Sequence, residues 1–237
     1  MTNWLMSKSE NIHGLDITVT RSKRKTVSIF VERDGSVSAR IPEKLSIDEL
    51  AETVKKKQYL IHKHLAEWEM LNDSKVKREF VNGQSFMYLG KNYRLKIVDN
   101  SAISGRVRLH RGYFEISKND IPKATSLFQQ FYKAKLEEKL PGLLGTYQKR
   151  LDLFAARIKV MELQNRWASC SLRGTLSFHW KCAMAPIDVL NYIVVHELIH
   201  LRYPNHSPAF WDEVDRAMPH YKTRDEWLRL NGAGMDL

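Results

Sequence analysis

The stretch His196-Glu197-Leu198-Ile199-His200 places two histidines and a glutamate together, and a further histidine, His206, follows it closely. Because an α-helix repeats every 3.6 residues, His196 and His200 would face one side of a helix and could hold one metal ion. Glu197 would lie about 100° further round the axis, with its carboxylate beside the metal. A turn-forming Pro-Asn pair precedes His206, so the chain can fold back and bring this third imidazole to the same ion.

These residue types favour hydrolytic chemistry at a zinc ion. Three imidazoles leave one position of a tetrahedral zinc site open. Zinc lowers the pKa of a bound water from about 15.7 to near 7, which provides a nucleophile at neutral pH. Glu197 would act as the general base and then pass the proton to a leaving amine. We therefore predict one zinc ion per chain, held by His196, His200 and His206.

The residues around the motif bear on the alternative, which is a chance pattern on an inert helix. Apolar side chains surround the three polar ones, so the helix is hydrophobic all round and is expected to be buried. A buried glutamate and two buried histidines need partners, and a metal ion satisfies all three. The flanking apolar residues are Ile193, Val194, Val195, Leu198, Ile199 and Leu201.

The second half of the chain contains the elements that would position this site. Residues 157–163 and 175–182 alternate apolar and polar side chains and predict two strands. The metal helix is expected to begin at Pro186, and Ser207-Pro208 predicts the start of another helix. A capping box at Thr223–Glu226 predicts the start of the last one.

The first half is expected to be rich in strands. Residues 16–41 and 80–116 show alternating patterns broken by turns, and a capping box at Ser46 and Glu49 begins a helix that runs to about Asn72. No internal sequence repeat is apparent. We predict an α+β protein with a flexible tail at 1–15, a basic β-rich module with one long helix at 16–118, and the metal-binding domain at 119–237.

Composition indicates the cellular location of the protein and the kind of partner it binds. The chain has 237 residues, a net charge of +11 and a pI of about 9.6. A basic balance favours anionic partners such as DNA or another polyanion, although a solvated basic face without a partner explains it equally well. The sequence shows no secretory signal and no long apolar run, and its two cysteines make no disulfide framework. We expect a cytoplasmic protein that does not contact the membrane.

Three segments together resemble a known family. They are Asn165–Ser171 (NRWASCS), Tyr192–Leu201 around the metal motif, and Asn205–Trp211 (NHSPAFW). In this order they are similar to the YgjP-like metallopeptidases, which are relatives of the SprT-like and WLM zinc proteases. The spacing from His200 to His206 also matches metzincins, but Tyr203 stands where metzincins have glycine.

The resemblance implies a zincin-like metallopeptidase domain, in which the HExxH helix packs on a small antiparallel sheet. It also implies that His196, His200 and His206 bind zinc and that Glu197 is the catalytic base. Zincins commonly bind a substrate strand along a sheet edge beside the metal helix, and Leu176, Ser177 and Phe178 are the candidate edge here, unless this strand is internal. The candidate stabilisers of the transition-state oxyanion or substrate are Tyr203, Tyr221 and Arg166.

Two hypotheses for function follow. The first is a zinc metallopeptidase, an endopeptidase that hydrolyses peptide bonds in protein substrates through a zinc-activated water and acts at nucleic acid. The second is a nucleic-acid-binding module in which the zinc site is structural and the basic first half contacts the polyanion. Both hypotheses are compatible with one chain, since the basic half could deliver a protease to its target.

Overall fold

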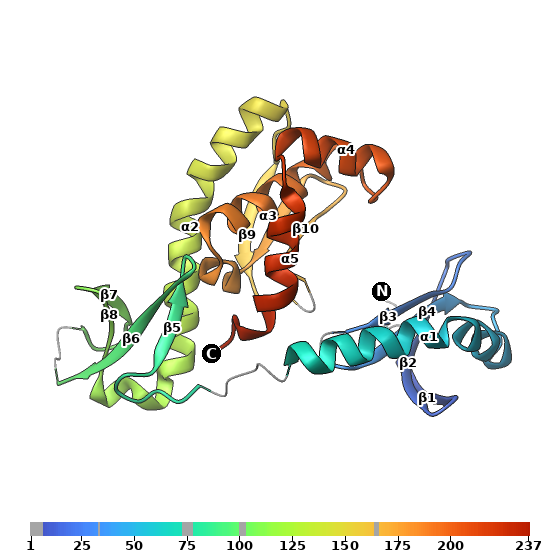
Figure 1. Cartoon of the computed structure of the whole chain (residues 1–237), viewed down its shortest axis with the longest axis horizontal. Coiled ribbons are helices and arrows are strands. Elements are labelled where there is room, and N and C mark those ends of the chain that lie inside the picture. Colours follow the sequence, from blue (N-terminus) through green and yellow to red (C-terminus); the bar gives the residue numbers. More distant parts are fainter. Residues whose placement is uncertain (1–6, 33, 73–77, 100–102, 164–165) are drawn as a thin grey trace, which may run out of the picture. The chain divides into compact units, whose positions relative to one another are not determined.

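A computed structural model describes residues 7–32, 34–72, 78–99, 103–163 and 166–237 of the chain (Figure 1). The chain divides into two compact units, Met1–Lys75 and Val76–Leu237. This division differs from the predicted boundary at 118/119, because the strands between 85 and 117 pack in one hydrophobic core with the helices that follow. The predicted tail at 1–15 also differs, since residues 7–12 form a strand.

The first unit is a four-stranded mixed sheet covered on one face by a long helix. Its strands are β1 (Ser7–Ile12), β2 (Leu15–Ser22), β3 (Ser28–Val31) and β4 (Val37–Pro42), in the order β1-β2-β4-β3. The hairpins β1–β2 and β3–β4 are antiparallel, and β2 runs parallel to β4. Alternate residues of β2 and β4 are buried against the helix α1 (Ile47–Asn72) and form the core of this unit.

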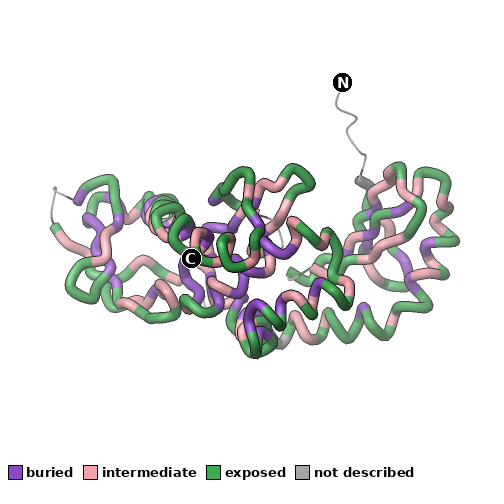
Figure 2. Tube along the Cα trace, turned by 90° about the horizontal axis from the view of Figure 1, so that it is seen from above, coloured by how far each residue is buried: buried purple, intermediate pink, exposed green. Residues whose placement is uncertain are grey.

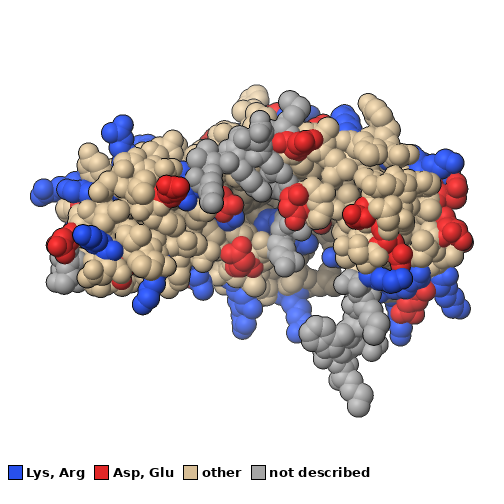
Figure 3. Space-filling model, turned by 90° about the horizontal axis from the view of Figure 1, so that it is seen from below, with Lys and Arg blue, Asp and Glu red and all other residues tan. Residues whose placement is uncertain are grey.

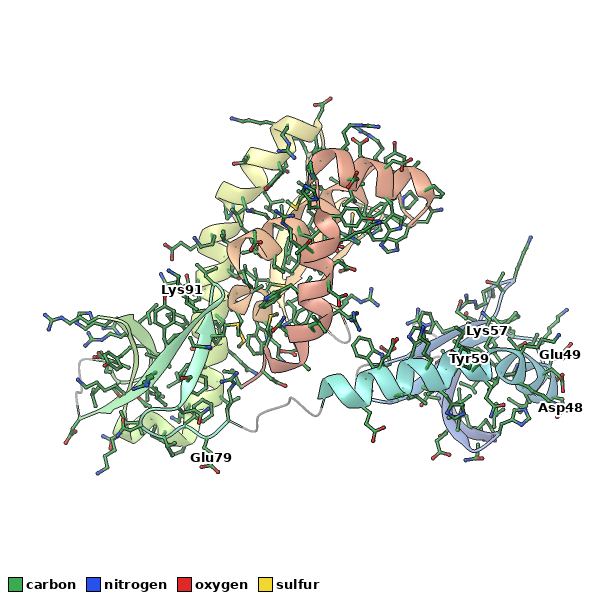
Figure 4. The ribbon with its side chains drawn as sticks, in the orientation of Figure 1. Asp48, Glu49, Lys57, Tyr59, Glu79 and Lys91 are labelled. Carbon is green, nitrogen blue, oxygen red and sulfur yellow. The ribbon has the colours of Figure 1, made fainter. Side chains whose placement is uncertain are left out.

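The predicted capping box at the start of α1 is confirmed. The Ser46 backbone N–H donates to Glu49 Oε2 at 2.8 Å, and the Glu49 N–H donates to Ser46 Oγ at 3.1 Å. The bond from the Ser46 N–H, together with one from the Ser46 hydroxyl to the same carboxylate, lowers the pKa of Glu49 from its ordinary value. Two N–H groups that the first turn leaves without helical partners are satisfied in this way. Figure 4 labels Asp48 and Glu49 at this end of α1, and Lys57 and Tyr59 further along the helix.

The second unit begins with another four-stranded mixed sheet followed by a long helix. The strands are β5 (Ser85–Tyr88), β6 (Lys91–Val98), β7 (Arg108–His110) and β8 (Tyr113–Ser117), in the order β5-β6-β8-β7. A short 3-10 helix η2 (Lys118–Lys123) leads into α2 (Ala124–Leu151), which continues past Pro141. The helix therefore does not end at this proline. Phe86 and Phe114 of the sheet contact Phe128 of α2.

The two sheets have the same topology, so the chain contains a structural repeat that its sequence does not show. Each consists of two antiparallel hairpins whose inner strands run parallel, and each is followed by a long helix. The first hairpin turns at His13-Gly14 in one copy and at Leu89-Gly90 in the other, and all four residues have positive φ. The turns fix equivalent registers in the first hairpins, where Ile12 pairs with Leu15 and Tyr88 pairs with Lys91. Between the hairpins, the pair Thr18 and Ser38 corresponds to the pair Arg94 and Tyr113.

The rest of the second unit contains the predicted metal-binding elements. A three-stranded sheet has the order β10-β11-β9, with β9 at Arg157–Met161, β10 at Ala168–Cys170 and β11 at Thr175–His179. The helices are α3 (Ile187–Ile199), α4 (Pro208–Ala217) and α5 (Tyr221–Asn231), with short 3-10 helices η3 (Trp180–Met184) and η4 (Gly232–Gly234). Figure 2 shows buried segments in purple in each unit.

The predicted α+β class agrees with this arrangement of sheets and helices, but two details differ. The small sheet is mixed rather than antiparallel, because β11 pairs antiparallel with β10 and parallel with β9. The last helix begins at Tyr221 rather than at the predicted capping box. No helix within the described ranges is long and apolar enough to cross a membrane.

Candidate metal centre

Helix α3 brings the first two histidines together. Its first turn carries Asp188, whose charge suits the positive end of the helix dipole. Apolar residues along the helix are buried on nearly every side, which confirms the prediction of a buried helix. His196 lies in its last turn and His200 is its C-cap, so both imidazoles leave the same end of the helix. This burial fixes the direction in which the two rings point.

The third histidine reaches the same place from the segment between α3 and α4. One ring nitrogen from each of His196, His200 and His206 lies within 4.8 Å of the others. Nε2 of His206 is 3.0 Å from Nε2 of His196. The first two side chains are half-buried and His206 is exposed, so the cluster opens to solvent on the side of the third ring. The structure therefore brings together all three histidines that the spacing predicted.

The state of the imidazoles suits metal binding. Nδ1 of His200 lies 2.9 Å from the carbonyl oxygen of Tyr203, and since a carbonyl can only accept, Nδ1 carries the proton and leaves Nε2 with a free lone pair. Burial, together with the neighbouring His200 and His206, lowers the pKa of His196 to about 3. Burial and His200 also lower the pKa of His206. Neutral imidazoles are the form that binds zinc.

Aromatic side chains from α4 and α5 enclose the histidines. The ring of Phe210 lies 4.9 Å from that of His196, 4.6 Å from His200 and 4.8 Å from His206. A stack of nearly parallel rings continues from the exposed His206 to buried rings. It runs through Trp211, Tyr221 and Tyr192, with centroid separations of 5.4, 5.4 and 6.1 Å. The hydroxyl of Tyr192 then donates to Asp225 Oδ1 at 3.1 Å.

Glu197 is a buried carboxylate with an unsatisfied oxygen. Its Oε2 has no hydrogen-bond partner among the described residues, and neither does Nδ1 of His196. Burial raises the pKa of Glu197 to about 8, against the charge of Arg166, which lowers it. An unpartnered buried carboxylate is costly. Together with the three converging imidazoles, this oxygen fits a site that holds a zinc ion and a water molecule.

The predicted substrate edge is wrong. Leu176, Ser177 and Phe178 lie on β11, which is the central strand of its sheet and is bonded to β10 on one side and β9 on the other. Leu176 and Phe178 are also fully buried. The edge strands are β9 and β10. Cys170 on β10 lies near Glu197 of the metal helix, since burial and the charge of Glu197 raise the pKa of its thiol. The free edge beside the metal helix is therefore β10.

The three candidate oxyanion or substrate residues lie in different settings. Arg166 is exposed, and its charge acts on Glu197. The backbone carbonyl of Tyr203 accepts the bond from His200. Tyr221 is buried in the ring stack, and burial raises the pKa of its hydroxyl. The roles of Phe210, Trp211 and Tyr192 beside the histidines were not predicted, since their spacing is equally typical of core residues.

Comparison with known proteins identifies the family. The model of the YgjP-like metallopeptidase domain matches residues 25–231. A crystal structure of the metallopeptidase zymogen abylysin from Pyrococcus abyssi is similar at 22% identity and a TM-score of 0.37, over 41% of this chain and 98% of that chain. No curated protein matches the chain. Because the family model spans most of the sequence, the chain belongs to the YgjP-like metallopeptidase family.

Proposed function

We propose that the chain is a zinc-dependent endopeptidase that hydrolyses peptide bonds in protein substrates. In this proposal His196, His200 and His206 hold one zinc ion and Glu197 is the general base. Membership of a metallopeptidase family implies a metal ion. The observation that carries the proposal is the convergence of three imidazoles beside a buried carboxylate oxygen that lacks a partner among the described residues.

Bound zinc supplies Lewis acidity, which lowers the pKa of water and polarises a peptide carbonyl. The residues of the chain handle the proton. Glu197 takes it from the attacking water and returns it to the amine nitrogen of the leaving fragment, and burial favours the protonated carboxyl that this second step needs. The exposed guanidinium of Arg166 is the best placed of the three candidates to stabilise negative charge, because its charge already reaches Glu197.

The open edge of β10 supports binding of an extended peptide. The Ser171 N–H donates to the Thr175 carbonyl, and the Trp167 carbonyl accepts from the His179 N–H. Backbone groups alternate sides along a strand, so Ser169 also faces β11, whereas the N–H and C=O of Ala168 and Cys170 face away from it. A substrate strand can bond to these outward groups. Such a strand extends on both sides of the scissile bond, which fits an endopeptidase.

The alternative, a nucleic-acid-binding module with a structural zinc site, is less well supported. Structural zinc sites usually have four protein ligands, whereas this cluster holds three and, among the described residues, no fourth histidine, cysteine or carboxylate. The exposure of His206 also leaves the site open to solvent. A cytoplasmic location remains part of our proposal, supported by two cysteines that form no disulfide.

A single substitution tests the mechanism. Glu197→Gln keeps the size of the side chain but cannot accept the proton, so it should retain one zinc ion per chain and lose cleavage of an unfolded protein such as casein by at least about a hundredfold. Zinc content is measured by atomic absorption on the same samples. Full cleavage by this variant would overturn the role of Glu197. Wild-type protein that binds zinc but cleaves no protein substrate would favour the structural alternative.

A further inference from the structure

The basic charge of the chain is concentrated in the second of the two repeated sheets. Residues 1–75 contain 13 lysines and arginines against 11 aspartates and glutamates, whereas residues 76–118 contain nine against three. The first unit is therefore nearly balanced, and the predicted basic N-terminal module owes most of its charge to the β5–β8 sheet. Lysine and arginine side chains project from the left end of the molecule in Figure 3, where Figure 1 places β6, β7 and β8.

The two copies of the repeat share their inner faces. When the copies are aligned on their hairpin turns and strand registers, equivalent inward positions are apolar in both, and they pack against α1 in one copy and against α2 in the other. The equivalent inward pairs are Ile17 and Tyr93, Val19 and Leu95, Ala39 and Phe114, and Ile41 and Ile116. The fold therefore requires this pattern on the inner face of each sheet.

The outer faces differ in chemistry. Thr18 and Thr20 on β2 correspond to Arg94 and Lys96 on β6, and Ser38 corresponds to Tyr113. Phe30 likewise corresponds to His110. The first face carries hydroxyl side chains and one cation, Arg40, which lies over the exposed ring of Phe30 at 5.3 Å. The second face carries Arg94 and Lys96, with Tyr113 at the turn end of β8.

The cationic side chains of the second face do not serve the fold. Like charges on one face of a sheet repel, and Thr is the better strand former at these positions. The acidic residue on this face, Glu115, already binds Arg108, with Nη2 to Oε2 at 2.7 Å. Arg94 and Lys96 are exposed and make no ion pair within the described part of the chain. At these two positions the first copy has threonines, and although Lys96 lies opposite Glu115 in the strand register, neither cation forms an ion pair among the described residues. Such cations favour an anionic partner.

The arrangement of the ring among the charges identifies the kind of anion. Tyr113 is 45% exposed on a central strand, and it lies between Arg94 of β6 and His110 of β7 in one cross-strand row. An exposed ring offers a surface on which a base can stack, and the flanking cations are placed to contact the adjacent phosphates. Paired bases in a duplex cannot stack on such a ring, and an acidic peptide has little use for it.

We propose that the outer face of the β5–β8 sheet binds single-stranded nucleic acid, with Tyr113 stacking on a base and with Arg94 and Lys96 contacting phosphates. This surface lies in the second unit and does not depend on the peptidase chemistry. It lies within the predicted basic module at 16–118 and narrows the proposed nucleic-acid contact to the β5–β8 sheet.

The repeat itself supplies the test substitutions, because the first copy shows which residues the fold accepts. Binding of the full chain to fluorescent 15-nucleotide oligo(dT), oligo(rU) and a 15-base-pair DNA duplex is measured by anisotropy at several salt concentrations. The test variants are R94T/K96T and Y113S. The matched control is K55T/K57T, which removes two exposed lysines from α1 in the first unit (Figure 4).

We expect one or both single strands to bind more tightly than the duplex. R94T/K96T should weaken binding at least tenfold and reduce the slope of log K against log salt by about 1.4, at about 0.7 per lost phosphate contact. Y113S should weaken binding at least about fivefold without changing the slope, as expected for a lost stacking contact of about 1 kcal/mol or more. K55T/K57T should bind as wild type, and thermal unfolding should confirm that each variant is folded.

Three results would overturn the proposal. The first is no binding of either single strand at low salt. The second is equal weakening by K55T/K57T and R94T/K96T, which would show attraction by net charge alone. The third is an unchanged affinity in Y113S or a preference for duplex, which would leave a general polyanion or acidic-protein surface. Repeating the measurement with Glu197→Gln separates this proposal from the peptidase proposal, since that variant should bind the strand as wild type does.

Discussion

The indole of Trp211 lies stacked on the imidazole of His206, with 5.4 Å between ring centroids and 20° between the ring planes. His206 is exposed and lies outside any helix, in contrast to His196 and His200, which the buried helix α3 holds. The stack continues to Tyr221 at 5.4 Å. The ring of the third histidine thus packs on Trp211 of α4, and Trp211 in turn stacks on Tyr221 of α5.

Replacing Trp211 with Ala should therefore weaken zinc binding. Loss of groups that orient a metal ligand commonly costs about 10- to 100-fold in affinity, and we expect at least a tenfold rise in the zinc dissociation constant by competition with a chromophoric chelator. Trp211→Phe keeps a ring against His206 and should bind zinc nearly as wild type. Equal zinc affinity of the Ala variant and wild type would show that His206 does not need the stack.

Zinc removal should destabilise only one of the two units. The three histidines lie in the second unit, and a ligand that binds only the folded state stabilises it by about 2.7 kcal/mol at a hundred times its dissociation constant. A chelator should lower the unfolding temperature of residues 76–237 and leave the unfolding transition of the first unit unchanged. Calorimetry with and without the chelator measures both transitions. His206→Ala should unfold at the same temperature in both conditions. A chelator shift in that variant would point to a different metal site.

Features of the fold and the metal centre that depend on neighbouring residues could be predicted from the sequence, whereas features that depend on distant parts of the chain could not. The histidines four residues apart and the capping box at Ser46 and Glu49 are set by helix geometry, and both predictions agree with the structure. The place of β11 in its sheet depends on which distant strands pair with it, and alternation along one strand carries no information about strand order. The edge prediction was wrong for this reason.

The structural repeat was missed for a related reason. Equivalent outward positions carry Thr18 and Arg94 in the two copies, so the sequences share only an apolar pattern and a turn glycine. A repeat reduced to such a pattern cannot be distinguished from any two sheets of similar length. The last helix was also placed late, because the Thr223 N–H bonds to the His220 carbonyl inside the helix and the Glu226 carboxylate accepts from Arg229. Neither residue of the predicted capping box therefore forms the cap.

The turn at Gly90 should be intolerant of a side chain. Gly90 has φ of +77° and lies where a Cβ would meet Pro186 Cγ at 2.8 Å and Pro186 Cα at 2.9 Å. Its N–H donates to the Met184 carbonyl at 2.8 Å, which docks the β5–β6 turn at the start of α3. Gly90→Ala should lower the free energy of unfolding by two costs. The left-handed backbone strain costs about 1 to 2 kcal/mol, and the clash with Pro186 costs about 1 to 3 kcal/mol.

Gly112→Ala is the matched control, because Gly112 has φ of +81° but no atom within 4 Å of the added Cβ. We expect the free energy of unfolding of this variant to fall only by the cost of the backbone strain, about 1 to 2 kcal/mol. Urea unfolding of the second unit measures both variants. Equal losses of unfolding free energy would show that the contact with Pro186 relaxes without cost.

The open edge of β10 makes a prediction that concerns substrate binding alone. The Cys170 N–H faces away from β11, so Cys170→Pro removes an N–H that the sheet does not use, and edge strands accept proline at such positions. If the substrate strand bonds to this edge, the variant should lower kcat/KM for a protein substrate at least about tenfold, the equivalent of one backbone hydrogen bond of about 1.4 kcal/mol. Zinc content and unfolding temperature should stay close to those of wild type.

Cys170→Ser is the control for this variant, since it keeps the N–H and replaces only the thiol. It should cleave with nearly the wild-type kcat/KM, because the proposed contact is made by the backbone. If the serine and proline variants lose activity equally, the side chain at 170 rather than the strand edge binds the substrate. Full activity in the proline variant would exclude this edge, and β9 would then be the remaining free edge of the sheet for an extended peptide.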